Sequence, residues 1–318
     1  MPSDVTTPPS PSSSPPPSHP DPWPELRLDA WRDTYATLHM WTQIVGKTRL
    51  ALAPPLNHWW HVTLYVTARG LTTGPIPFGA RTFDVEFDFI DHRLVVRTSD
   101  GEGQTIDLVP RSVAEFYGLY LAALNRLAIP VKLWPMPVEV EHPVRFTDDR
   151  DHASYDAEYA NRFWRTLVRV DHVLKRFRGR FLGKSSPVHF FWGGFDLAAT
   201  RFNGKRAPER PDPMNREAYS HEVISHGFWP GSAPVLESAF YAYAAPEPEG
   251  LATATIRPEA AYYHPELREF ILPYEAVRNA AVPEAAIASF IDSTYDRAAT
   301  LAAWDRESLE RALPATQR

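Results

Sequence analysis

Two segments in the second half of the chain mix potential acids, bases and cation donors with large aromatic rings. In the segment 189–202 the side chains that could do chemistry are His189, Trp192, Asp196 and Arg201, and in the segment 219–231 they are His221, Glu222 and Trp229. An imidazole can serve as a general base, and a guanidinium group pairs naturally with a carboxylate or a phosphate. Such a mixture is typical of a ligand site, but Asp196, Arg201 and Glu222 could equally form an ion-pair network that closes a sheet. The residues therefore locate a candidate site without specifying a reaction.

The pair His221-Glu222 has the beginning of a zinc-protease motif, which requires a second histidine four residues after the first on one helical face. Position 225 is serine, and the next histidine is His226. Five residues turn a helix by roughly 500°, and in a strand an odd separation puts two side chains on opposite faces. The alternation around the pair favours a strand, so the spacing argues against a zinc protease.

Histidines distant in sequence could still meet at a metal ion. The candidates are His58, His61, His189, His221, His226 and His264. Histidine in an aromatic-rich strand is more often a hydrogen-bonded structural residue. A metal-dependent enzyme therefore stays as an alternative, and no metal ligand is assigned.

Gly193-Gly194 interrupts the aromatic segment. Glycine weakens a strand interior, so it usually marks a bulge or the close approach of another backbone or a ligand. No GxGxxG or GxxxxGK phosphate loop accompanies it, and the chain has no GxSxG nucleophile elbow. Glycine-rich nucleotide binding is unsupported, and the bulge and the ligand approach both stay open.

The first half supplies a second set of candidate ligand-binding residues. Apolar residues at helical spacing predict a helix over 28–45 that ends at Gly46 and carries a polar row beside its apolar face: His39, Gln43 and Lys47. Alternation then predicts a strand over 58–67, which carries His58 and His61. If chemistry occurs, we expect a histidine as general base and Arg201 or Lys47 as the clamp for an anion.

The order helix, antiparallel strands, helix occurs twice along the chain. Strands are expected near 83–89, 94–96 and 106–108, before a helix over 110–127. A helix over 153–178 then precedes strands near 188–202, 222–228, 236–243 and 269–272 and a last helix over 283–304. This order favours an α+β fold with two similar halves, 25–150 and 151–306, and it leaves an internal pseudo-repeat open. We expect the halves to pack as one unit with a cleft between them.

Composition restricts the protein's class further. Residues 1–24 are mostly Pro and Ser, which predicts a disordered tail, and 307–318 is expected to be a C-terminal tail. The absence of cysteine excludes disulfides, thiol nucleophiles and Cys-ligated zinc. No basic n-region, apolar h-region or long apolar run is present, so we expect a cytoplasmic protein without a membrane partner.

Charge argues against a nucleic-acid partner. The chain has 33 basic and 39 acidic residues, a net charge of −6, whereas nucleic-acid binding requires a basic footprint. The segment 162–184 is the one basic stripe, and an exposed solvated helix face is the favoured interpretation of it.

Four stretches together resemble a known family. They are Thr37–Lys47 with Asn57–His61, the run Ser186–Asp196, and Phe228–Gly231. In combination they resemble an uncharacterised bacterial family of proteins with a domain of unknown function, over nearly the whole chain after about Trp23. The resemblance implies a bacterial, soluble protein of one continuous unit, and it implies no activity, cofactor or catalytic residue.

The leading hypothesis is an aromatic-walled cleft that binds a small polar or anionic ligand. Its residues would be His39, Gln43, Lys47, His58, His61, His189, Trp192, Asp196, Arg201, Glu222 and Trp229. A non-enzymatic interaction protein is a further alternative, which would have no enclosed polar pocket.

Overall fold

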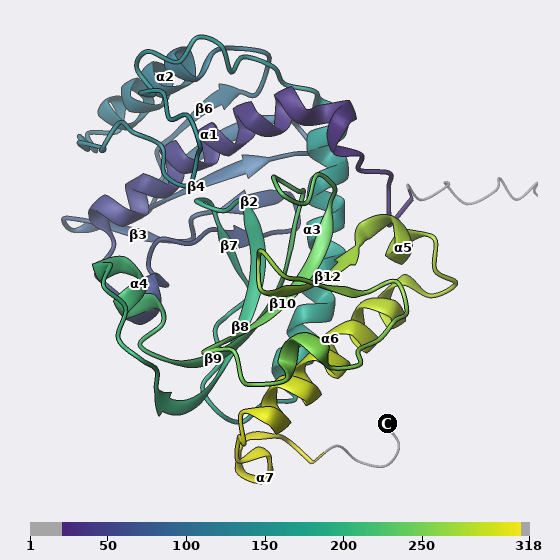
Figure 1. Cartoon of the computed structure of the whole chain (residues 1–318). Coiled ribbons are helices and arrows are strands. Elements are labelled where there is room, and N and C mark those ends of the chain that lie inside the picture. The colour runs from purple at the N-terminus through teal and green to yellow at the C-terminus, as the bar shows by residue number, and fades with distance from the viewer. Residues whose placement is uncertain (1–20, 313–318) are drawn as a thin grey trace, which may run out of the picture.

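Alternating apolar and polar residues build two antiparallel sheets, which a computed structural model of the protein shows over the described residues 21–312 (Figure 1). Within this part of the chain each sheet has six strands, and helices pack on them, so the fold is mixed α+β as predicted. Of the tail predicted for residues 1–24, residues 1–20 lie outside the described residues. No helix between residues 21 and 312 is long and apolar enough to cross a bilayer.

The first half begins with a long helix and continues into the first sheet. Its elements are α1 (Leu28–Leu52), the 3₁₀ helix η1 (Asn57–Trp59), β1 (Tyr65–Val66), β2 (Gly70–Thr72), β3 (Ile76–Phe78), β4 (Arg81–Asp88), β5 (Arg93–Thr98), β6 (Gly103–Asp107) and α2 (Val113–Arg126). The strand order is β1-β2-β4-β5-β6, and β3 also pairs with β4. Phe83, Val85 and Phe87 point from β4 into the core, where α1 and α2 pack.

The second half repeats this plan with additions. Its elements are α3 (Ala157–Gly179), β7 (His189–Phe191), β8 (Asp196–Arg206), α4 (Pro213–Ala218), β9 (His221–Trp229), β10 (Ala239–Ala245), η2 (Leu251–Thr253), β11 (Tyr262–His264), β12 (Glu269–Pro273), α5 (Tyr274–Arg278), α6 (Pro283–Leu301) and α7 (Arg306–Leu309). The strand order is β11-β12-β10-β9-β8-β7. The two sheets differ in strand order and connections, so the internal repeat stays a prediction.

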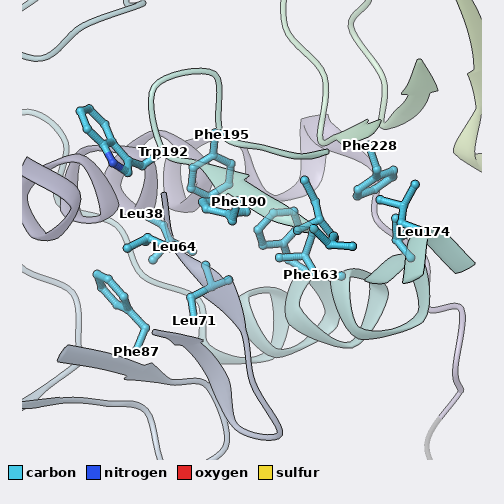
Figure 2. Close-up of a cluster of buried hydrophobic side chains, with 14 of the residues drawn as sticks. Leu38, Leu64, Leu71, Phe87, Phe163, Leu174, Phe190, Trp192, Phe195 and Phe228 are labelled. Atoms are coloured by element: carbon cyan, nitrogen blue, oxygen red, sulfur yellow. The ribbon is translucent and has the colours of Figure 1, made fainter. Parts of the chain in front are cut away.

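One hydrophobic core joins the halves. Leu38, Leu64, Leu71 and Phe87 of the first half lie in the same cluster as Phe163, Phe190 and Phe195 of the second (Figure 2). Two backbone hydrogen bonds between Leu64 and Phe190, of 2.9 and 2.8 Å, also bridge the sheets. The apolar stripe of α3 faces this core, as its spacing of Phe163, Leu167, Val170 and Leu174 predicts.

Three predicted elements are corrected by the structure. The first helix does not end at Gly46, because Gly46 lies inside α1, where a Cβ would be 2.2 Å from the Trp192 ring. The strand over 58–67 is wrong, since His58 and Trp59 have positive φ angles of 58° and 61° in a turn and only residues 65–66 form a strand. The strand over 188–202 is two strands, and Gly193-Gly194 lies in the turn that joins β7 to β8 rather than in a bulge.

The folded part extends beyond both predicted tail boundaries. Trp23 is buried beside Tyr274, whose hydroxyl donates to the Pro24 carbonyl at 2.8 Å. At the other end, α7 includes residues 307–309, and Glu310 pairs with Phe181 in an isolated bridge.

Candidate functional site

The second sheet has one face in the core and one face toward a pocket. Leu197 and Ala199 of β8 point into the main core with residues of α3, whereas Asp196, Ala198 and Thr200 share the opposite face because side chains alternate along a strand. In Figure 1, α6 lies to the right of this sheet and α4 to its left. The face away from the core carries its own small apolar clusters, and it carries the candidate site.

The pocket on this face has a volume of about 470 Å³. Small residues at the centre of the sheet leave the space open: Ala198 and Thr200 of β8 and Ser225 of β9. Large rings stand around them as walls: Trp59, Trp60, Phe191, Phe202, Tyr219, Tyr241 and Tyr243. Residues of α4 complete the rim, where the Trp59 indole donates to the Met214 carbonyl at 3.1 Å.

One end of the pocket holds two carboxyl groups. Asp196 is the first residue of β8, and the Tyr241 hydroxyl of β10 donates a hydrogen bond to its Oδ2. A Cβ at Gly194 would lie 3.0 Å from Asp196 Oδ1 and 3.4 Å from Glu139 Oε2, so both carboxyl groups lie beside this glycine. Among residues 21–312, neither Asp196 nor Glu139 forms an ion pair.

Desolvation raises the pKa of the acids around this end of the pocket. Desolvation raises the pKa of Asp196 to about 7, opposed by the Tyr241 hydrogen bond and reinforced by the nearby Glu139. Desolvation also raises the pKa of Glu139, and it raises the pKa of Glu269 on β12 to about 7, with Asp196 adding to the effect. A carboxyl group with a pKa near neutrality can exchange a proton at physiological pH.

A buried glutamine of α1 positions the loop that carries Glu139. The Gln43 side chain is fully buried, donates to the Val138 carbonyl at 2.8 Å and accepts from the Val138 N–H at 2.9 Å. The next residue, Glu139, has a positive φ of 55°, a conformation that a residue with a side chain seldom adopts. The strained backbone aims the Glu139 carboxylate at Gly193, where a Cβ would lie 2.2 Å from its Oε1. Gly193 therefore leaves room for this carboxylate.

His39 of α1 holds the turn between β7 and β8 that contains Gly193. Its Nε2 lies 2.7 Å from the Gly193 carbonyl oxygen, to which it donates a hydrogen bond. The ring packs against Tyr35 and Phe195, and burial lowers the pKa of His39 to about 4. A neutral imidazole in this position holds the β7–β8 turn and does not itself line the pocket.

Gly227 makes the position of Tyr241 possible. It lies beside Tyr241 in the register of β9 and β10, and a Cβ on it would come within 2.3 Å of the Tyr241 ring. The Tyr241 ring therefore lies across Gly227 of β9, which brings the Tyr241 hydroxyl to Asp196 on β8, the strand on the other side of β9.

The opposite end of the pocket is formed by η1 and the far part of β8. Lys184 Nζ donates to His58 Nε2 at 2.6 Å, and His58 Nδ1 donates to the Ala218 carbonyl at 3.0 Å. Both imidazole nitrogens are thus engaged, and burial lowers the pKa of His58. The Lys184 ammonium group also lies over the Trp60 and Phe202 rings, 5.3 and 4.9 Å from their centres.

Several predicted site residues lie near this pocket but serve the packing around it. His61 accepts the Leu56 N–H at 3.1 Å, and the Trp192 indole donates to the Val62 carbonyl at 2.6 Å. His189 is fully buried among Trp60, Tyr65 and Phe191. The Lys47 amine lies over the Trp192 and Phe146 rings, and Trp229 packs on Tyr241.

Arg201 and Glu222 do not join Asp196. Arg201 is five residues after Asp196 on the same strand and points from the opposite face, toward α3 and α6. Glu222 is on that opposite face of β9 and accepts a hydrogen bond from Asn203. A single cleft that gathers all the predicted residues is therefore not formed, and of that set Asp196 and His58 line the pocket.

The metal-dependent alternative has no assembled ligand set in the part of the chain that the structure describes. No three side chains of the metal-ligating types come together there. His189 and His226, two of the candidate ligands, are both fully buried, and His226 contacts the Thr294 hydroxyl at 3.0 Å.

Sequence reasoning missed the second carboxyl group and the tyrosines. Tyr241 and Tyr243 alternate with Ala242 and Ala244 in β10, a pattern that could have indicated one polar aromatic face. Glu139 stands in a proline-containing loop, and its place in the pocket depends on Gln43, which is 95 residues away in sequence. No local signal marks it.

Comparison with known proteins places the chain in a family. A model for a family of unknown function (DUF5996) matches residues 23–311. No curated protein and no solved structure matches the chain. The match confirms the resemblance to a domain-of-unknown-function family and leaves the chemistry to be argued from the pocket.

Proposed function

The chain belongs to the DUF5996 family of unknown function, and we propose that it binds a small organic cation, such as an amine or ammonium compound, in the aromatic-walled pocket of the second sheet. The observation that carries the proposal is the desolvated carboxyl group of Asp196, which has no basic partner among residues 21–312 and has the exposed Glu139 carboxylate beside it. Phe191 and Tyr243 supply the electron-rich faces that favour a bound cation. The resemblance also supports a bacterial protein, and the cytoplasmic location expected from the sequence stays part of this proposal.

The charge of the pocket favours a cation over the anion that the sequence allowed. No lysine or arginine is among the described residues that line it. An anion in the pocket would add like charge beside the desolvated Asp196 carboxyl group and the Glu139 carboxylate, whereas a cation would supply the missing partner. Arg201 and Lys47, the predicted anion clamps, are not among its lining residues.

Acids elsewhere in the molecule show what purely structural pairing produces. On the outer face of the first sheet, Asp88 pairs with Arg69, and Glu86 pairs with Arg97 at 2.6 Å. Buried carboxylates without such partners reduce stability, so a fold retains them most readily where they act on something else. The contrast supports a ligand role for Asp196, whereas Glu139 is exposed at the edge of the pocket.

The shape of the pocket sets the size of the ligand. A volume of about 470 Å³ lies in the range of small-molecule sites. Asp196 and Phe202 are six residues apart on β8, which separates the two ends by roughly 20 Å. We expect the charged nitrogen at the Asp196 end and an apolar or ring-containing portion toward Phe202.

Acid–base chemistry by Asp196 is a second candidate function. Its pKa of about 7 allows Asp196 to give or take a proton near neutral pH, and Tyr241 can hold its ionised form. His58 is less suited to the general-base role predicted from the sequence, because both of its ring nitrogens already have partners.

Three probes of one shape and different charge test the cation proposal. They are 2-phenylethylammonium, 2-phenylethanol and 3-phenylpropanoate, titrated at neutral pH and followed by protein NMR or calorimetry. We expect the ammonium compound to bind at least about tenfold more tightly than the alcohol and the carboxylate not to bind measurably. Binding should release protons, because a cation favours the ionised form of Asp196.

Two variants and one control assign the effect to the pocket. Asp196→Asn and Glu139→Gln should each weaken ammonium binding, and Asp84→Asn on the outer face of the first sheet should leave it unchanged. Equal affinity for the three probes, or preference for the carboxylate, would show that the acidic pair does not select the ligand.

A further inference from the structure

A second pocket lies on the opposite side of the second sheet, away from the Asp196 site. It has a volume of about 710 Å³ and lies among the end of α3, the strand β8, the helix α6 and the C-terminal segment around α7. Six arginines and three acids line it. In a chain whose net charge is −6, this concentration of guanidinium groups is exceptional.

The three acids of the pocket are already engaged. Asp292 receives two hydrogen bonds from Arg180, and Arg306 binds both Asp296 at 2.7 Å and Glu310 at 2.6 Å. The remaining arginines are Arg201, Arg257, Arg297 and Arg311, and none of them has a carboxylate partner among residues 21–312. Four positive charges are thus left to act on a ligand.

Arg201 is the buried member of this set. It is 3 % exposed, its guanidinium carbon lies 3.4 Å from the centre of the Phe177 ring and 4.3 Å from that of Tyr295, and it donates to the Phe177 carbonyl. Its Nε is buried and has no hydrogen-bond partner within the described residues. Desolvation lowers the pKa of Arg201 to about 10, so the group remains charged at neutral pH.

We propose that this pocket binds the phosphate group of a small phosphorylated molecule, with Arg201 at its floor and Arg257 and Arg297 at its rim. A stacked guanidinium group is held in one orientation and presents a planar set of donors, the geometry that pairs with phosphate oxygens through two hydrogen bonds. The exposed arginines can close on the same group from the solvent side.

The size and surroundings of the pocket favour a small ligand larger than inorganic phosphate. A volume of about 710 Å³ leaves room for an organic portion beside the phosphate. A neighbouring hollow of about 430 Å³ shares Arg180, Asp292 and Arg311 with the pocket and adds Arg176. The site is separate from the proposed cation site, because Arg201 and Asp196 project from opposite faces of β8.

Pyrophosphate is the probe for this proposal, titrated calorimetrically at about 150 mM salt so that exposed charges are screened. We expect saturable binding that becomes at least about tenfold weaker in Arg201→Met, which keeps an apolar side chain of similar length between the rings. The double variant Arg257→Ala/Arg297→Ala, which alters exposed residues, should weaken binding by a similar factor. Arg93→Ala, at an exposed arginine of the first sheet, is the matched control and should change affinity less than about twofold.

The outcomes distinguish a phosphate pocket from a purely structural arginine cluster and from a nucleic-acid surface. Unchanged affinity in both pocket variants, or no saturation up to about 10 mM pyrophosphate, overturns the proposal. If Arg201→Met does not fold, the double variant decides. A single-stranded oligonucleotide that binds more tightly than pyrophosphate and is not displaced by it would assign the arginines to nucleic acid and overturn the small-molecule proposal. Asp196→Asn should leave pyrophosphate binding intact, so the two proposals can fail independently.

Discussion

Strand β8 carries two desolvated charged groups of opposite sign on its two faces, neither with an ion-pair partner among residues 21–312. Asp196 opens into the aromatic pocket, where desolvation raises its pKa to about 7, and Arg201 opens into the arginine-lined pocket, where desolvation lowers its pKa to about 10. The two groups could neutralise each other if they met, but their odd spacing places the sheet between them. The sheet therefore separates an acidic pole, the Asp196 end of the aromatic pocket, from a basic pole, the arginine-lined pocket around Arg201.

The difference between the poles lies in how each charge is supported. Arg201 is stacked between Phe177 and Tyr295, so its alkyl and guanidinium parts contribute to packing. Asp196 has a single tyrosine donor, a second acid nearby and open space in front of it. We infer that Arg201 combines a structural role with a binding role, whereas Asp196 reduces stability until a ligand arrives.

The largest expected effect comes from removing the packing of Arg201. Arg201→Ala should lower the free energy of unfolding by roughly 2–4 kcal/mol, because it leaves a cavity between two rings and removes the guanidinium donor to the Phe177 carbonyl. Arg201→Met should stay within about 1 kcal/mol of the natural protein, since it fills the same space without a charge. Chemical denaturation measures both, and equal losses in the two variants would show that the charge itself stabilises the fold.

The Asp196 side of the comparison predicts a change of the opposite sign. Asp196→Asn should raise the free energy of unfolding at pH 8 by roughly 2–4 kcal/mol, because it removes a desolvated negative charge. Below about pH 3 the carboxyl group is protonated in both the folded and the unfolded chain, so the gain should disappear.

The pH window follows from the raised pKa of Asp196. As pH rises above the ordinary carboxyl value of 3.8, the unfolded chain ionises first and the natural protein loses stability, and the loss is complete once pH passes the folded value of about 7. Denaturation from pH 4 to 8 should give a flatter profile in Asp196→Asn, with a residual slope from Glu269. The matched acid Glu86→Gln should instead lose about 1 kcal/mol at pH 8, because it breaks the pair with Arg97. A gain in both variants would mean that pairing does not distinguish the two sheets.

Strong periodic patterns made much of the fold predictable. The apolar stripe of α3 and the alternation in β4 have one interpretation each, and both elements occur within a few residues of the expected bounds. The strand predicted over 58–67 is wrong, although the alternating rings of this segment resemble a strand pattern. His58 and Trp59 instead form a turn that is stabilised by contacts with α4, about 155 residues later. The prediction that the first helix ends at Gly46 is wrong because this glycine leaves room for the Trp192 ring, a contact that sequence spacing cannot reveal.

The sequence predicted a site residue only where the residue type and its position in a strand were enough to place the side chain. Asp196 was identified from its aromatic surroundings, and the odd number of residues between Asp196 and Arg201 would have separated them had strand parity been applied to that pair. Glu139 could not be found, because a side chain of α1 fixes its loop by two hydrogen bonds to Val138. Hydrogen bonds between a side chain and a backbone 95 residues away leave no pattern in the local sequence.

The smallest expected effect tests whether Glu139 belongs to the acidic pole. Gly193→Ala would place a methyl group 2.2 Å from Glu139 Oε1, and the flexible end of that side chain can move away. We expect a stability change below about 1 kcal/mol, a lower pKa of Asp196 because a neighbouring negative charge has moved off, and roughly three- to tenfold weaker ammonium binding. Carbon-13 NMR of the carboxyl groups measures the pKa. Gly118→Ala, in α2 with no atom within 4 Å of the added methyl group, is the control and should stabilise the helix by about 0.5–1 kcal/mol without altering Asp196. An unchanged Asp196 pKa in Gly193→Ala would mean that the two carboxyl groups titrate independently, and the acidic pole would then consist of Asp196 with Tyr241 alone.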